Sequence, residues 1–230
     1  MLTYFYNITN DISFLIFNTS SPYLILMSFL LGSIPFGLII SLLTGHGDIR
    51  NIGSGNIGAT NVLRTGNKPL AALTLIADLT KGFGALYLNK ILITEIFNLD
   101  VMALQYSLVC IAVVLGHMFS PWIRFKGGKG VATTAGILIF ISWPCFLLSG
   151  LIWILIVFAS KKSSLGALSA SVSAPIFLWS LKQINELNVS YETPKIFTSE
   201  IIAISIIMVL IWLKHQSNIK RIISRKESEI

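Results

Sequence analysis

The sequence is poor in charged residues. Only 12% of its 230 residues are Asp, Glu, Lys or Arg, whereas 54% are hydrophobic and the mean hydropathy is +0.78. A soluble domain has about 25% charged residues, so this composition predicts an integral membrane protein. The formal charge of +7 is spread over short segments between apolar runs. A nucleic-acid-binding protein would instead concentrate it on a water-facing domain, so no nucleic-acid partner is expected.

Other chemistries are excluded by residues that the chain lacks. Its two cysteines, Cys110 and Cys145, fall within apolar runs and are predicted to be small buried hydrophobic residues. No cluster of His, Cys, Asp and Glu has the spacing of metal ligands, and no catalytic triad is recognisable. Neither a metal ion nor a cofactor is therefore expected. The amino-terminal segment lacks a basic region and a small-residue cleavage site, so no removable signal peptide is predicted.

Apolar runs long enough to cross a membrane divide the chain. A spanning helix needs roughly 20 apolar residues, and the run 131–160 is too long for one such helix. We interpret it as two short spans with a turn at Pro144, because Lys161 and Lys162 then return to the side of Lys126 and Lys129. The sequence thus predicts an all-α, polytopic membrane protein with about seven transmembrane helices. The predicted spans are 22–43, 70–88, 101–123, 131–143, 145–160, 165–181 and 200–213, between a variable amino-terminal segment (1–21) and an exposed basic tail (214–230).

Basic residues are distributed unequally between the two sides that this topology creates. Thirteen Lys and Arg residues fall on one side, three (Lys90, Lys182 and Lys195) fall on the other, and Lys81 lies within a span. Cytoplasmic loops are enriched in Lys and Arg, so the richer side is predicted to be cytoplasmic. The amino terminus would then lie outside and the carboxyl terminus in the cytoplasm.

The segment 53–66 (GSGNIGATNVLRTG) is the most polar run between two apolar segments. Its glycine amides are able to surround an anion, and its Ser, Asn, Thr and Arg side chains offer hydrogen-bond donors. Gly53, Gly55 and Gly58 match the G-x-G-x-x-G spacing, but no strand precedes them, so a dinucleotide fold is excluded. The alternative interpretation is an ordinary flexible connector.

Two further polar patches lie on the predicted cytoplasmic side. The turn 126–130 (KGGKG) comes directly before the helix expected from Val131, where amides, a helix dipole and two ammonium groups suit a phosphate. The alternative is a basic anchor that only sets topology. His215, Asn218 and Arg221 recur every three residues and are expected on one helical face. This face would either bind phosphate oxygens or lie on anionic lipid headgroups.

Three ionisable residues are predicted within spans. Asp78 and Lys81 are three positions apart, and we expect them to form an ion pair that offsets the cost of burying each charge. His117, near the cytoplasmic end of its span, is either a proton carrier or a packed side chain.

Taken together, these motifs resemble the bacterial acyl-phosphate:glycerol-3-phosphate acyltransferase family. The matching segments are LGSIPFG (31–37), RNIGSGNIGATNVLRTG (50–66), DLTKG (78–82), LGHMFSPW (115–122), FKGGKGVAT (125–133) and HxxNIxR (215–221); 1–21 and 182–199 fall outside the resemblance. The resemblance implies a seven-span enzyme of the bacterial inner membrane with a cytoplasmic active site. It implies transfer of a fatty acyl group from acyl phosphate to the 1-position of glycerol 3-phosphate, giving lysophosphatidate in phospholipid biosynthesis. The enzyme that forms acyl phosphate would be its functional partner.

By motif position, the resemblance implies that Ser54, Arg64, Lys129, His215 and Asn218 line the site, together with Ser164 in the KKSS turn. The residues predicted to be catalytic are Ser54, Lys129, His215 and Asn218; those predicted to bind substrate are Gly53, Gly55, Asn56, Asn61, Arg64, Lys126, Gly127, Gly128, Ser164 and Arg221; those predicted to be structural are Asp78, Lys81 and His117. No base adjoins Ser54 in sequence, so we interpret its hydroxyl as orienting rather than nucleophilic. The hydroxyl proton of the acceptor would leave through His215 or through the departing phosphate.

Two hypotheses of other classes remain. A transporter for an anionic solute would use the same loops as a gate, but the paired broken helices or internal repeat expected of it are not seen. A lipid-binding scaffold without catalysis is the third interpretation.

Overall fold

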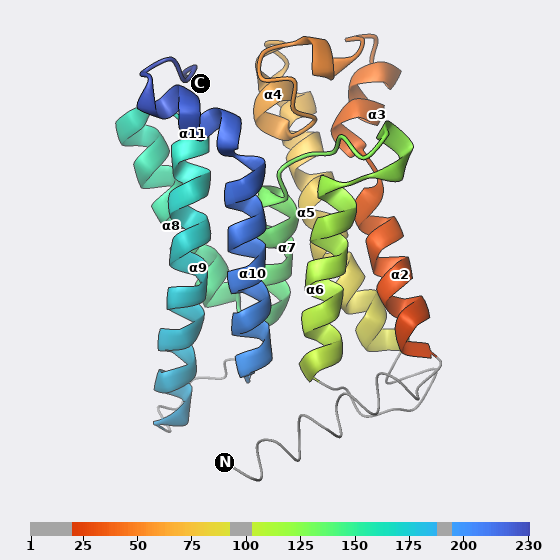
Figure 1. Ribbon diagram of the computed structural model, residues 1–230, viewed down its shortest axis with the longest axis vertical. Coiled ribbons are helices and arrows are strands. Elements are labelled where there is room, and N and C mark those ends of the chain that lie inside the picture. Colours follow the sequence, from red (N-terminus) through yellow and green to blue (C-terminus); the bar gives the residue numbers. More distant parts are fainter. Residues whose placement is uncertain (1–19, 93–102, 188–194) are drawn as a thin grey trace.

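The computed structural model describes residues 20–92, 103–187 and 195–230, and all regular structure within these residues is helical. Most of the helices run side by side as a bundle, and the short helices lie at one end with the loops that follow Leu43 and Met118 (Figure 1). This confirms the all-α prediction, while most of the predicted segment 1–21 lies outside the described residues. The helices are α2 (Ser20–Ser33), α3 (Phe36–Leu43), η1 (Ile49–Asn51), α4 (Ala59–Leu63), α5 (Lys68–Ile91), α6 (Ala103–Met118), η3 (Pro121–Ile123), α7 (Val131–Ile141), α8 (Trp143–Ser160), α9 (Ser163–Glu186), α10 (Thr198–Lys214) and α11 (Gln216–Ile223).

The lengths of these helices bear on the predicted crossings. Among the described residues, the segments long and apolar enough to span a membrane are Pro22–Leu43, Lys68–Ile91, Ala103–Ile123, Trp143–Ser160 and Ser163–Glu186. A sixth is the pair α10 and α11, which is bent by 61°. Helix α7 is apolar but has only 11 residues, or about 16 Å at 1.5 Å per residue. Each predicted span therefore overlaps a helical segment, while seven crossings and the orientation of the termini stay predictions.

The break within 131–160 differs from the predicted turn at Pro144. Helix α7 ends at Ile141 and α8 begins at Trp143, with Ser142 in an extended conformation between them. The Ser142 hydroxyl accepts the backbone N–H of Cys145 at 3.4 Å and so caps α8. Pro144 lies in the first turn of α8, where a missing N–H is tolerated. The proline thus starts a helix of 18 residues rather than ending one.

Glycines bring two helix pairs into close contact. Between α2 and α6, a Cβ atom on either Gly32 or Gly116 would lie 2.0 Å from a backbone oxygen of the other helix. The α5–α7 pair repeats this arrangement, since a Cβ atom on Gly82 or Gly136 would lie 2.0 or 1.9 Å from a backbone oxygen across the interface. Such small-residue contacts are typical of membrane helix interfaces. The second pair fixes α7, whose amino end follows Lys129, against α5.

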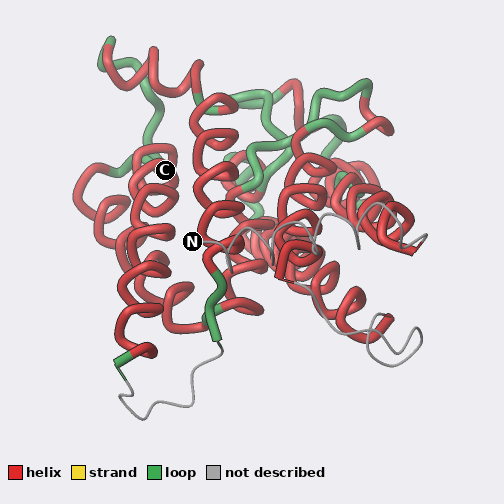
Figure 2. The backbone as a smooth tube through the Cα atoms, turned by 60° about the horizontal axis from the view of Figure 1, so that its bottom comes forward, coloured by secondary structure: helices red, strands yellow, loops and turns green. Residues whose placement is uncertain are grey.

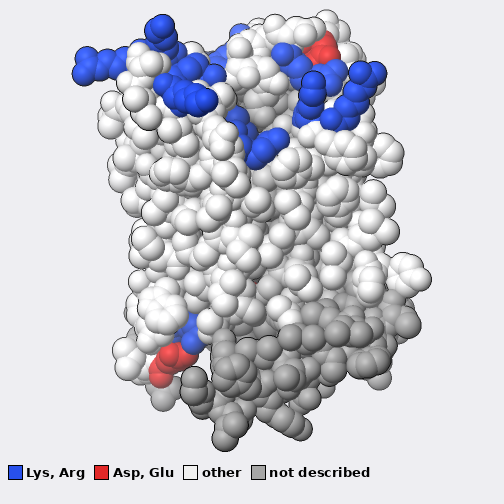
Figure 3. Space-filling model, in the orientation of Figure 1, with Lys and Arg blue, Asp and Glu red and all other residues white. Residues whose placement is uncertain are grey.

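The loops that join α3 to α5 and α6 to α7 lie next to each other at one end of the bundle (Figures 1 and 2). Lys and Arg side chains gather at this same end in the view of Figure 3. The main hydrophobic core lies between the long helices, and the two cysteines are buried in it as predicted. The fold therefore places polar loops over one end of an apolar bundle.

Candidate active site

A cavity of about 450 Å³ begins among these loops and extends between the helices, a size usual for ligand sites. Its polar lining comes from loops and helix ends, and its apolar lining comes from helix interiors. The polar set includes Ser54, Asn56, Asn61, Arg64, Asp78, Lys129, Ser163, Ser164, His215, Asn218, Glu227 and Ser228; the apolar set includes Leu138, Phe146, Trp153, Ile154, Ala167, Ala174, Ile204, Met208 and Ile211. Such a lining suits an amphipathic ligand with a polar head.

Asn61 organises the loop that contains Ser54 and Arg64. Its Nδ2 donates to the carbonyl oxygens of Ile49 and Ile52, both at 2.9 Å. Its Oδ1 accepts the Ser54 N–H at 3.0 Å, the Ser54 hydroxyl at 3.2 Å and Arg64 Nη1 at 3.3 Å. The Asn61 side chain is therefore engaged within the loop, where it orients two predicted site residues. The Ser54 hydroxyl contacts an amide and not a base, in keeping with an orienting role.

The first two glycines of this loop, Gly53 and Gly55, allow its backbone to turn. Gly53 and Gly55 have φ values of +54° and +70°, which residues with a Cβ atom rarely adopt. A Cβ atom on Gly53 would also lie 2.7 Å from both Asn61 Oδ1 and Arg64 Cδ. Neither glycine lies in the cavity lining. Both glycines are needed for the turn, and their contact with substrate stays a prediction.

The KGGKG turn packs on the end of α6. The N–H groups of Gly127 and Gly128 donate to the carbonyls of Met118 and His117 at 3.2 and 3.0 Å. A Cβ atom on Gly127 would lie 2.1 Å from the His117 oxygen, and one on Gly128 would lie 2.1 Å from His117 Nε2. The expectation that these two amides bind an anion is therefore wrong, because both are already engaged. Lys126 is exposed and lies outside the cavity lining.

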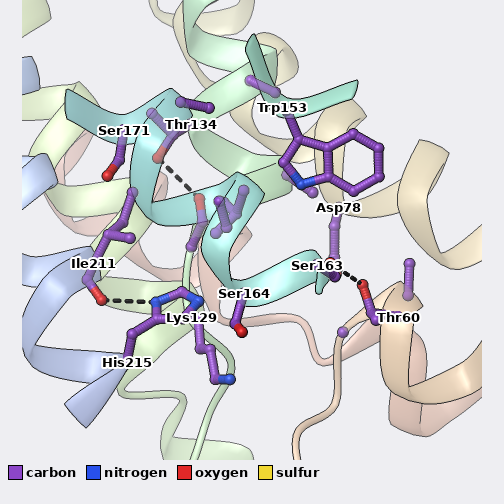
Figure 4. Close-up of a pocket in the computed structure, with 18 of the residues that line it drawn as sticks. Thr60, Asp78, Lys129, Thr134, Trp153, Ser163, Ser164, Ser171, Ile211 and His215 are labelled. Atoms are coloured by element: carbon purple, nitrogen blue, oxygen red, sulfur yellow. Dashed lines mark hydrogen bonds between the residues drawn. The ribbon is translucent and has the colours of Figure 1, made fainter. Parts of the chain in front are cut away.

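Lys129 extends into the cavity at the amino end of α7 (Figure 4). Its Nζ donates to Asn218 Oδ1 at 2.5 Å, and Gly130, with φ +82°, precedes the helix. The first amides of a helix lack partners within it, and they attract anions. Burial lowers the pKa of Lys129 to about 8, although the Glu227 carboxylate opposes this shift. A cation and a helix amino end thus face the same space.

His215 lies at the bend between α10 and α11. Its Nδ1 is 2.8 Å from the carbonyl oxygen of Ile211, which only accepts, so we assign the proton of the neutral ring to Nδ1 and leave Nε2 as an acceptor. Burial, reinforced by the Lys129 cation, lowers the pKa of His215 to about 4. The ring is therefore neutral near pH 7. Figure 4 shows it between Ile211 and Lys129.

Glu227 is a residue of the site that the sequence did not predict. Its Oε1 accepts Ser164 Oγ at 2.7 Å and Asn218 Nδ2 at 2.6 Å, and its Oε2 accepts Arg221 Nε at 2.7 Å. Desolvation alone would raise the pKa of Glu227, but these three donors outweigh it and lower the pKa. The tail predicted to be exposed instead forms α11 and folds back onto the cavity. A lone Glu in a charged run gave no signal of this contact.

The ion pair predicted within the membrane is present beside the cavity. Lys81 Nζ lies 2.9 Å from Asp78 Oδ1, and both residues are 2% exposed. Lys81 also donates to the Ile34 carbonyl at 3.1 Å, which ties α5 to the break between α2 and α3. His117 Nδ1 is 3.7 Å from Asp78 Oδ1. Asp78 and His117 also line the cavity, so the structural role of this cluster stays a prediction.

The cavity lining sorts the predicted residues into two groups. Ser54, Asn56, Asn61, Arg64, Lys129, Ser164, His215 and Asn218 line it, whereas Gly53, Gly55, Lys126, Gly127, Gly128 and Arg221 do not. Arg221 still contacts the site through Glu227. Within the described residues, no group of three His, Cys, Asp or Glu side chains is arranged to hold a metal ion.

Comparison with known proteins identifies the family. The model of the family described as "Glycerol-3-phosphate acyltransferase" matches residues 23–225. The chain belongs to this family. It is 44% identical over 204 residues to a glycerol-3-phosphate acyltransferase of Allorhizobium ampelinum, with 89% of each chain covered. It is 43% identical over 205 residues to that of Bartonella quintana, again with 89% of each covered. The protein is thus an integral membrane acyltransferase of phospholipid synthesis.

Solved structures agree with this assignment. The fold is similar to that of PlsY (YgiH), an integral membrane glycerol 3-phosphate acyltransferase, in its glycerol 3-phosphate form, with a TM-score of 0.77 and 34% identity. That match covers 92% of this chain and 96% of the other. The lysophosphatidic acid form of PlsY matches with a TM-score of 0.75 and 32% identity, covering 92% and 95% of the two chains.

Proposed function

We propose that the protein transfers a fatty acyl group from acyl phosphate to the 1-hydroxyl of glycerol 3-phosphate, releasing lysophosphatidate and phosphate. The observation that carries this proposal is one cavity with a cationic, hydrogen-bonding end and an apolar extension. The relatives are named for glycerol 3-phosphate, and the similar structures are of a glycerol 3-phosphate form and a lysophosphatidic acid form. A substrate with a phosphate head and a product with an acyl chain both suit such a cavity.

The phosphate groups bind at the loop end. Arg64 and Lys129 supply cations from two different loops, and the amino end of α7 supplies backbone amides. Asn218, which accepts from Lys129, fixes the direction of the ammonium group. This arrangement neutralises the charge on a leaving phosphate.

The acyl chain lies in the apolar part of the cavity and enters from the lipid. Small side chains on α9, at Ala167, Ala170 and Ala174, leave room beside it. Leu75 on α5 and Ile154 on α8 line the cavity and are also 47% and 56% exposed. The wall between these helices is therefore the side on which a chain in the bilayer reaches the site.

The reaction needs no covalent enzyme intermediate, because acyl phosphate is a mixed anhydride. The hydroxyl oxygen of glycerol 3-phosphate bonds to the acyl carbon, the bond from that carbon to the phosphate oxygen breaks, and phosphate departs. Holding both substrates in one cavity supplies proximity. The hydroxyl proton leaves through the departing phosphate or through Nε2 of the neutral His215 ring, whose Nδ1 is engaged with the Ile211 carbonyl.

The basic end of the bundle faces the cytoplasm of a bacterial cell, following the bias of Lys and Arg. The amino terminus is then outside the inner membrane, and seven crossings satisfy this parity. Glycerol 3-phosphate arrives from the cytoplasm, and an enzyme that forms acyl phosphate supplies the donor.

The test is to incubate the purified protein with palmitoyl phosphate and glycerol 3-phosphate and to measure lysophosphatidate. Palmitoyl-coenzyme A replaces palmitoyl phosphate in the control. We expect product only with the acyl phosphate. A folded protein that yields none, but moves glycerol 3-phosphate across a vesicle membrane, would show the transporter to be correct.

A further inference from the structure

The segment after α11 reverses direction at a defined turn. Arg225 adopts a left-handed conformation with φ +57°. The N–H of Lys226 donates to the Arg221 carbonyl at 2.7 Å, and that of Arg225 donates to the Ile222 carbonyl at 3.1 Å. These two bonds form a Schellman motif, the common way to end a helix and redirect the chain. The redirected segment runs back to the cavity.

The reversed segment inserts its carboxylate among the donors of the site. The Glu227 side chain is 3% exposed and receives hydrogen bonds from Ser164 on α9 and from Asn218 and Arg221 on α11. Ser228 accepts a hydrogen bond from Arg64 Nη2. The segment therefore contacts all three elements that hold these side chains, and it lies in the lining of the cavity.

These donors are the ones that a phosphate group would use. A phosphate and a carboxylate both accept from hydroxyl, amide and guanidinium groups. Asn218 donates a hydrogen bond from Nδ2 to Glu227 and accepts one at Oδ1 from Lys129. The carboxylate and the ammonium group therefore bind the same side-chain amide. A phosphate that accepts hydrogen bonds from Ser164 and Asn218 cannot bind while Glu227 accepts the same two hydrogen bonds.

We propose that Glu227 is an internal competitor that occupies a phosphate subsite, formed by Ser164, Asn218 and Arg221, and leaves when a phosphate ester binds. This inference rests on the proposed function for the identity of the ester. Phosphate has three acceptor oxygens and close to two negative charges, whereas the carboxylate has two oxygens and one charge, so substrate displaces the segment. The match to the family covers residues 23–225, so Glu227 lies outside the matched region.

The test compares Glu227→Ala with Glu229→Ala. Glu229 is an exposed carboxylate two residues away, so it controls for the charge of the segment. Binding of inorganic phosphate to the purified, detergent-solubilised protein is measured by calorimetry. If the segment is docked in nine molecules of ten, its removal lowers the apparent Kd of phosphate about tenfold. We expect this change in Glu227→Ala, a smaller one in Glu227→Gln, and none in Glu229→Ala.

Kinetic measurements identify which substrate has the phosphate group that competes with Glu227 for the subsite. The KM for glycerol 3-phosphate and the KM for palmitoyl phosphate are measured separately, and we expect one of them to fall in Glu227→Ala. A phosphate Kd that is unchanged or weaker in Glu227→Ala overturns the inference. A fall in kcat with no change in either KM also overturns it, since that result makes Glu227 a residue that positions Asn218. If phosphate binds more tightly but no variant forms lysophosphatidate, the proposed function fails while the competitor role holds.

Discussion

Asp78 and Glu227 are both carboxylates that border the cavity, but the chain holds them in opposite ways. Asp78 pairs with Lys81, three residues away on the same helix, and both are buried within the bundle. Glu227 belongs to a segment without regular structure, and Ser164, one of its partners, lies 63 positions away in sequence. Asp78 is fixed in place whenever α5 forms. Glu227 reaches the cavity only while a turn keeps its segment folded back.

The difference separates two uses of charge near a membrane. A buried ion pair compensates charges that have no route to water. At the loop end, the cations remain uncompensated unless an anion binds, and Glu227 supplies that anion in the absence of substrate. Removing a charge in the first region should therefore change stability, and removing one in the second should change binding and activity.

The largest effect is expected from Asp78→Ala. It leaves the Lys81 ammonium buried without its partner, which typically costs about 3–5 kcal/mol of unfolding free energy. Thermal unfolding in detergent measures the change. The double variant Asp78→Asn, Lys81→Met is the control, because it removes both charges and should recover most of the stability. A double variant as unstable as the single one would show that the ion pair is not the cause.

Lys129→Ala should lower kcat about 100- to 1000-fold, the usual effect of removing one group that stabilises transition-state charge. The variant should still fold and insert, because Lys129 lies in a loop and is already partly compensated by Asn218. Turnover and thermal unfolding are measured on the same preparation. Full activity of Lys129→Ala would remove Lys129 from the phosphate site.

Kinetic measurements over a range of pH test whether the site needs the charge of Lys129 rather than the shape of its side chain. The folded pKa of about 8 lies below the ordinary value of 10.5, so the ammonium group is lost as the pH rises through about 8. The unfolded chain keeps that proton up to its higher pKa, so the free energy of unfolding rises with pH between the two values, as the cost of burying the ammonium group is relieved. We expect kcat to fall above pH 8 by up to about tenfold per unit.

Lys129→Arg is the control for this series, because a guanidinium group stays charged throughout the range. Its kcat should not depend on pH between 7 and 9.5. An equal fall in both proteins would assign the titration to another group.

The smallest effect is expected from Arg225→Gly. The left-handed conformation costs a residue with a Cβ atom about 1 kcal/mol or more, and glycine removes this cost. The segment should then dock more firmly, and the KM that falls in Glu227→Ala should here rise by up to about fivefold. Arg225→Lys keeps the strain and serves as the control. An unchanged KM in Arg225→Gly would mean that the turn does not limit docking.

Much of the fold could be predicted because long apolar runs leave few alternatives in a bilayer. The ranges of the long helices follow from those runs. The unequal number of Lys and Arg residues on the two sides placed the segments that contain Arg64, Lys129 and Asn218 on the same side. The break at Ser142 was predicted two residues late. A proline is tolerated at the start of a helix as readily as it ends one, and the sequence does not distinguish the two cases.

Two features of the site could not be predicted. A KGGKG turn suits an anion and also suits close packing, and only the position of α6 shows that the amides of Gly127 and Gly128 are used by backbone carbonyls. Docking of Glu227 depends on a left-handed turn at Arg225, a residue that rarely adopts it. No local pattern in the sequence indicates such a turn, so the tail was predicted to be exposed.

The shortness of α7 has a consequence for where the reaction occurs. Its length of about 16 Å is about half of a hydrocarbon core of about 30 Å, so if α7 is a span, one of its ends lies at a depth that lipid tails normally occupy. Around such a helix the boundary between water and oil would be displaced inward, and the site would form a trough in the membrane surface. Under the proposed function, a water-soluble acceptor and an oil-soluble donor would meet at this boundary, and neither would have to be transferred into the other's phase.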